Sequence, residues 1–85
     1  MARYRWFMAE GATESLTRLP IRHRREILKY IGQIAEYPEQ AADREEQLER
    51  KDFVKTKRFG QWLITWWVDG PVKEVQIFGF EKVPR

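Results

Sequence analysis

The 85-residue chain contains no cysteine, one histidine and no long apolar run. The absence of cysteine excludes a disulfide framework, a zinc site built on thiolates, an iron–sulfur cluster and a thiol nucleophile. One histidine, His23, cannot build a histidine-rich metal site, and we expect no metal and no small-molecule cofactor. We expect the imidazole to be solvated, with a phosphate contact as the alternative. The longest apolar stretches, residues 6–9 and 66–68, are too short to span a membrane, so we expect a cytoplasmic protein without a membrane partner.

Aromatic side chains are plentiful for a chain of this size, with five Phe, four Trp and three Tyr. A domain of this length buries only about 64% of its unfolded surface, which leaves little room for an inefficient core. Large rings supply much buried area per residue, which can replace the disulfides or zinc that stabilise many other small domains. We therefore expect one domain, residues 1–85, built around an aromatic-rich core.

Charge changes sign along the chain, although the formal net charge is only +3. Residues 22–25 are Arg-His-Arg-Arg, residues 43–50 carry four acidic and two basic side chains, and residues 51–58 carry four basic side chains and one acidic. The net charge therefore understates how basic one face can be, and a basic face fits an anionic partner.

The periodicity of apolar residues predicts an α+β fold. Alternating residues 4, 6 and 8 indicate a first strand, and apolar residues at 27, 28, 31, 34 and 35 indicate a helix over 21–36. A shorter helix capped by Thr13 precedes it. Residues 52–59, 61–68 and 72–80 predict an antiparallel meander. The fold class is thus β-α-α-β-β-β, two helices packed on a four-stranded, mostly antiparallel sheet, with segment 39–50 a short exposed helix or a structured loop.

Basic side chains gather on the first strand of this meander. Lys55 and Lys57 share one face about 7 Å apart, close to the spacing of successive phosphates on a single nucleic-acid strand. Lys82 and Arg85 follow the last strand, and a folded-back tail would bring them beside Arg58 and the two lysines in one cleft that stabilises an anionic transition state. The alternatives are lysines that only protect an edge strand and a tail that is frayed.

Other residues can contact a nucleic acid outside that cleft. Trp66 is expected in the core, whereas Trp67 lies on the opposite face and is a candidate platform for stacked bases. Arg22, Arg24 and Arg25 lie in the first turns of the long helix, where the helix dipole disfavours positive charge. Their position suggests a role in nucleic-acid binding, or merely in solubility.

Together these residues and elements resemble the RelE/ParE superfamily of bacterial toxins, most closely its HigB-like branch. The segments YRWFM, FVKTKRFG, QWLITWWVDG and VKEVQIFGFEKVP fall where the family has its counterparts, and Gly79-Phe80-x-Lys82 is the most particular match. The resemblance implies a RelE-like fold and the toxin of a type II toxin–antitoxin system that cleaves mRNA on the ribosome without a metal. It implies catalytic roles for Lys55, Lys57 and Lys82. The implied partners are a cognate antitoxin, the ribosome and mRNA, with operator DNA reached only through the antitoxin.

Two departures from the family pattern support an alternative. The family often has an arginine early in its third strand, in the context Gly-x-Tyr-Arg, where this chain reads Gly60-Gln61-Trp62-Leu63. Its catalytic tyrosine or histidine near the C-terminus has no counterpart before Arg85. The alternative is a catalytically degenerate binding module that acts on a protein such as gyrase, or only binds an antitoxin, through Trp67 and its apolar surroundings. A third possibility is an α+β domain without toxicity.

Overall fold

The computed structural model describes residues 4–38, 44–47 and 53–84. In this part of the chain the helices are α1 (Glu10–Arg18) and α2 (Ile21–Glu36), and the strands are β1 (Arg5–Met8), β2 (Arg44–Gln47), β3 (Phe53–Phe59), β4 (Trp62–Asp69) and β5 (Glu74–Lys82). The strands form one sheet in the order β1-β5-β4-β3-β2. β1 is parallel to β5, and all other neighbours are antiparallel.

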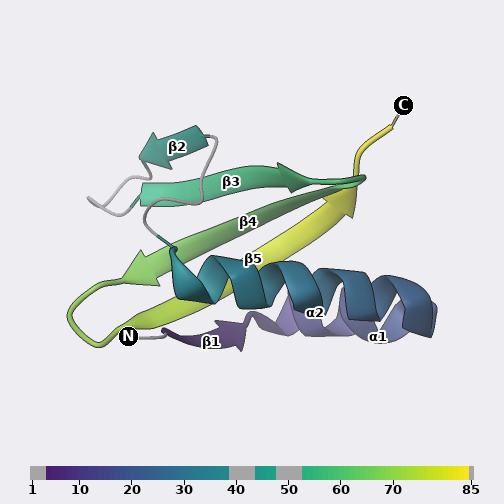
Figure 1. Ribbon diagram of the computed structural model, residues 1–85, viewed down its shortest axis with the longest axis horizontal. Coiled ribbons are helices and arrows are strands. Elements are labelled where there is room, and N and C mark those ends of the chain that lie inside the picture. The colour runs from purple at the N-terminus through teal and green to yellow at the C-terminus, as the bar shows by residue number, and fades with distance from the viewer. Residues whose placement is uncertain (1–3, 39–43, 48–52, 85) are drawn as a thin grey trace.

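The predicted fold class is confirmed, with one strand added. Two helices precede the meander and pack on one side of a mixed sheet (Figure 1). Residues 44–47, for which we expected a helix or a loop, instead form β2 along the outer edge of β3. The other residues of segment 39–50 lie outside the described part of the chain.

The sheet has a covered and an uncovered face, which we call the helix face and the open face. Along β4, residues 62, 64 and 66 are buried and face α2, whereas residues 63, 65 and 67 are only half-buried and point to the open face. Ile27, Ile31 and Ile34 of α2 complete the core on the helix face. The predicted apolar stripe is therefore right except at Leu28, which is 40% exposed.

The two helices begin in different ways. α1 begins at Glu10 and not after Thr13, whose hydroxyl donates back to the Ala9 carbonyl at 3.2 Å from within the helix. α2 begins directly after Pro20, whose fixed φ suits the residue that precedes a helix. Among the described helices, none is both long and apolar enough to cross a membrane.

Gly60 forms the β3–β4 turn with Gln61 and is constrained twice. Its φ is +59°, and an added Cβ would lie 3.2 Å from the Tyr30 hydroxyl of α2. Because side chains other than glycine's are strained at positive φ, we expect Gly60→Ala to lower the free energy of unfolding by about 1–2 kcal/mol. Urea unfolding measures this.

The matched control for this variant is Gly70→Ala. A Cβ at Gly70 meets nothing within 4 Å, and Gly70 lacks a positive φ. Its expected change in the free energy of unfolding is within about 0.5 kcal/mol. Equal stability of the two variants would contradict the assignment of strain to Gly60.

Candidate functional site

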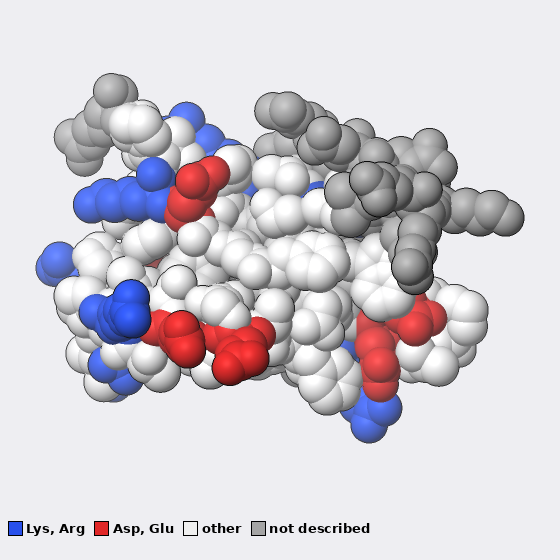
Figure 2. All heavy atoms as spheres, turned by 180° about the vertical axis from the view of Figure 1, so that it is seen from behind, with Lys and Arg blue, Asp and Glu red and all other residues white. Residues whose placement is uncertain are grey.

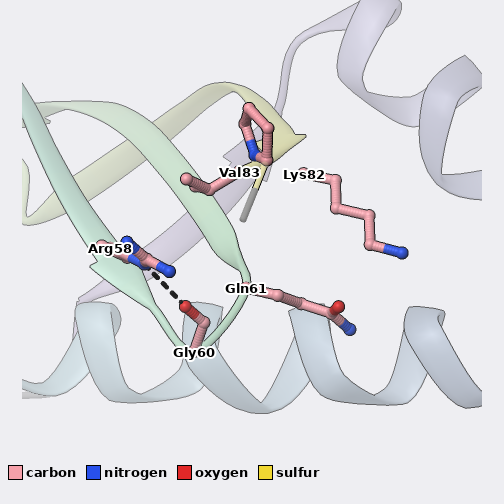
Figure 3. A pocket seen from close by; sticks show the side chains of 6 residues that line it. Arg58, Gly60, Gln61, Lys82 and Val83 are labelled. Carbon is pink, nitrogen blue, oxygen red and sulfur yellow. Dashed lines mark hydrogen bonds between the residues drawn. The ribbon is translucent and has the colours of Figure 1, made fainter.

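A pocket of about 590 Å³ opens where the β3–β4 turn meets the end of β5 (Figure 3). It is lined by Arg58, Gly60, Gln61, Lys82, Val83 and Pro84. The Val83 amide donates to the Gln61 carbonyl at 2.7 Å, which joins the two sides of the pocket through the backbone. The side chains of Gln61 and Lys82 extend in the same direction, above α2 (Figure 3).

Arg58 forms the other side of this pocket. Its Nε donates to the Gly60 carbonyl at 2.9 Å, so the guanidinium is held against the turn. Arg58 belongs to the open face, whereas Lys82 is paired with Trp62 in the sheet and belongs to the helix face. The two cations therefore line one pocket from opposite faces of the sheet, and the Lys82 side chain extends away from Arg58 (Figure 3).

The structure separates the predicted lysines from this pocket. Lys55 is only 4% exposed and lies on the helix face, opposite Trp66 in the register. The Lys57 ammonium lies 5.7 Å from the centroid of the Phe59 ring, on the same face. Neither lines the pocket. The reason is the alternation along β3, because both lysines share the parity of buried Phe59 and so face α2.

Of the five cations expected in one cleft, the structure thus brings together Arg58 and Lys82. Arg85 lies outside the described residues. Lys55 is buried, and the register places Glu45 of β2 opposite it along the neighbouring strand.

The other predicted residues lie away from the pocket, on β4 and at the start of α2. Trp66 is completely buried and Trp67 is half-buried on the open face, as the alternation predicts. Arg22 and Arg25 are exposed on α2, but Arg24 is half-buried and its Nε donates to the Leu19 carbonyl at 2.8 Å. Arg24 therefore joins the start of α2 to the end of α1.

The open face itself is largely uncharged at its centre. Figure 2 views the molecule from the side away from α2 and shows a broad uncharged area, with charged side chains toward its edges. A shallow pocket of about 260 Å³ on β4 and β5 includes Leu63, Thr65 and Phe78. This face suits an apolar contact better than a phosphate backbone.

The sequence analysis missed a pair formed by His23 and Glu26. His23 Nδ1 lies 3.0 Å from Glu26 Oε1, and the imidazole is 18% exposed, not solvated as we expected. Its ring meets the Trp62 ring edge-on, with 5.6 Å between centroids. The hydrogen bond from His23 lowers the pKa of Glu26, and the charge of Arg22 acts in the same direction. The signal was the i, i+3 spacing, which places two residues on one side of a helix.

Comparison with known proteins identifies the fold. No family model and no curated protein matches the chain. The archaeal RelE–RelB complex from Pyrococcus horikoshii superposes with a TM-score of 0.76 at 18% identity, covering 99% of each chain. The RelBE2 toxin–antitoxin complex from Mycobacterium tuberculosis gives 0.73 at 19% identity, covering 95% of this chain and 99% of that one.

The isolated RelE toxin from E. coli gives a TM-score of 0.76 at 15% identity, covering 96% of this chain and 86% of that one. TM-scores of 0.73 to 0.76 over nearly the whole chain establish the architecture and the order of its elements, although the sequence identity is low. They agree with the two helices and mixed sheet described above. The chain therefore has the fold of the RelE toxins.

Proposed function

We propose that the chain is the toxin of a type II toxin–antitoxin pair, of the HigB-like branch, and that it binds RNA at the pocket between Arg58 and Lys82. The observation that carries the proposal is this pair of cations at an open pocket on a RelE fold. Solved structures with the same fold include RelE–RelB toxin–antitoxin complexes, which supports a cognate antitoxin as partner. Gly79-Phe80-x-Lys82 supports the HigB-like branch.

The pocket is large enough for part of the backbone of a single strand. Its volume of about 590 Å³ lies in the range of ligand sites, roughly 300–1,000 Å³. Arg58 and Lys82 would contact phosphates of the strand from the two faces of the sheet, and Lys82 would neutralise the charge that develops when the ribose 2′-hydroxyl attacks the adjacent phosphorus. We assign no substrate contact to Lys55. Lys57 would contact the RNA strand only outside the pocket.

The activity we propose is cleavage of mRNA on the ribosome, in the cytoplasm, with operator DNA reached only through the antitoxin. Induced expression in a bacterial host should arrest growth and produce discrete cuts in translated mRNAs, mapped by primer extension. Purified protein should co-sediment with ribosomes and cut mRNA in their presence. The absence of both ribosome association and cuts would overturn the proposal.

A second candidate function is a protein-binding module without RNA cleavage, and the open face favours it. Phe7 and Phe78 are 45% and 42% exposed there, beside half-buried Trp67. Exposed aromatic side chains of this kind are common in protein interfaces. Growth arrest without mRNA cuts, accompanied by inhibition of gyrase, would favour this function over the first.

A further inference from the structure

The tautomer of His23 follows from its hydrogen bond to Glu26. The lowered pKa of Glu26 keeps this carboxyl group ionised at neutral pH, and an ionised carboxylate only accepts hydrogen bonds. At 3.0 Å the imidazole must therefore donate, which places its proton on Nδ1. In neutral imidazole the other nitrogen, Nε2, then carries the lone pair and can accept a proton.

Nε2 forms no hydrogen bond to any described residue, and the side chain is 18% exposed. The ring is therefore reachable from solvent, while its orientation is fixed by Glu26 on one side and by the Trp62 ring on the other. A base held by a carboxylate and packed against a rigid ring is the arrangement by which enzymes orient a catalytic histidine.

Trp62 connects this pair to the pocket. It follows Gln61 directly, is paired with Lys82 in the sheet, and meets the Phe80 ring edge-on at 6.0 Å between centroids. Gln61 and Lys82 both line the pocket, and their side chains extend above α2, the helix that carries His23 (Figure 3). His23 does not itself line the pocket, but its ring contacts Trp62, the residue that follows Gln61 of the lining.

Trp62 adds a second observation at the same place. It is 4% exposed, and its indole Nε1 has no hydrogen-bond partner in the described part of the chain. The Trp62 N–H contributes to lowering the pKa of Glu26, so the indole donor faces the same carboxylate that holds His23.

We propose that His23 is the general base of this site and that Glu26 positions it. The inference rests on the proposed RNA cleavage. Nε2 takes the proton of a ribose 2′-hydroxyl, the 2′-oxygen forms a bond to the adjacent phosphorus, and the bond from phosphorus to the 5′-oxygen breaks. Water protonates the leaving 5′-oxygen, and His23 returns its proton to solvent. The products are a 2′,3′-cyclic phosphate and a 5′-hydroxyl, and Lys82 neutralises charge on the phosphate.

Arg22 of α2 acts on the carboxylate of the His23–Glu26 pair, and Lys82 lies on the same face of the sheet as Trp62. Because only a base without a bound proton can take the proton of the 2′-hydroxyl, the rate of cleavage by the unmodified chain should rise with pH and then level off.

The test is single-turnover cleavage of ribosome-bound mRNA by the full chain as a function of pH. His23→Asn keeps a donor for Glu26 but has no proton acceptor, and we expect its rate to fall about 10²- to 10⁴-fold and to lose the rise with pH. Dissolved imidazole should restore part of the rate of His23→Ala. Glu26→Gln keeps an acceptor without charge and should lose about 10-fold.

The matched control is Gln33→Ala, an exposed residue of α2 outside the site, whose rate should equal that of the unmodified chain. A His23→Asn rate within threefold of the unmodified chain would overturn the role of His23 and leave the proposed function standing. If imidazole does not rescue the lost rate and the rate still rises with pH, His23 has only a structural role, and its role as the base is overturned. Absence of cleavage by the unmodified chain would overturn both proposals.

Discussion

Replacement of Trp66 by alanine should lower the free energy of unfolding by about 3–5 kcal/mol. Trp66 is completely buried on the helix face, where it packs with the isoleucines of α2 and with the apolar residues of β5. Its Nε1 also donates to the Pro38 carbonyl at 3.2 Å, just beyond the end of α2. A chain of this length has a total stability of about 4–13 kcal/mol, so the variant loses a large part of it.

Two variants separate the contributions of Trp66. Trp66→Phe keeps much of the buried ring but leaves the Pro38 carbonyl without its donor, and should lower the free energy of unfolding by about 1–3 kcal/mol. Trp67→Ala removes the same side chain one position later, from the half-buried open face, and should have a smaller effect than Trp66→Ala. Denaturant unfolding measures all three. An equal loss for Trp66→Ala and Trp67→Ala would contradict the assignment of the core to the helix face.

The double variant Arg58→Ala/Lys82→Ala should weaken binding of single-stranded RNA about 10- to 100-fold. Both cations line the pocket, and a cation bound to a phosphate releases a counterion. The slope of log affinity against log salt should therefore decrease in magnitude by about 1.4, since each contact on a single strand contributes about 0.7. The loss should be uniform across sequences, because phosphate contacts carry no base information. Binding isotherms at several salt concentrations measure both quantities.

The control for this variant must have the same net charge. Arg18→Ala/Lys29→Ala also removes two positive charges, from exposed positions on α1 and α2 that do not line the pocket. Its salt slope should stay near that of the unmodified chain. Equal losses in both double variants would show that overall charge, and not the pocket, binds RNA. Growth arrest that survives Arg58→Ala/Lys82→Ala would favour the protein-binding module.

The spacing of apolar residues predicted the helices and strands that have one regular apolar face. The stripe of Ile27, Ile31 and Ile34 predicted α2, and the alternation along β4 placed Trp66 and Trp67 on opposite faces. β2 was not predictable, because its sequence Arg-Glu-Glu-Gln has no apolar alternation and pairs with β3 through a register set by distant residues. Strand formation there depends on the neighbouring strand more than on intrinsic preference.

The site was predictable only in part for a related reason. The alternation along β3 correctly placed Lys55 and Lys57 on one face, but the sequence does not say which face α2 covers. Predicting the pocket requires knowing that Arg58 and Lys82 lie together, and these residues come from different strands and opposite faces of the sheet. The pairing of His23 with Glu26 is local and could have been predicted from its helical spacing, but its contact with Trp62 depends on the tertiary fold.

The parallel pairing of β1 with β5 has a consequence for the synthesis of this protein. Arg5 and Glu74 form an ion pair at 2.8 Å across 69 positions of sequence, and Val75 and Ile77 of β5 complete the core. The nascent chain therefore cannot close its hydrophobic core until its last strand has emerged from the ribosome. Such distant contacts also slow folding after release, since loop closure precedes the stabilising pairing. Because Lys82 ends β5, the pocket that it lines also forms only after this strand has been synthesised, at elongation rates of about 5–20 residues per second.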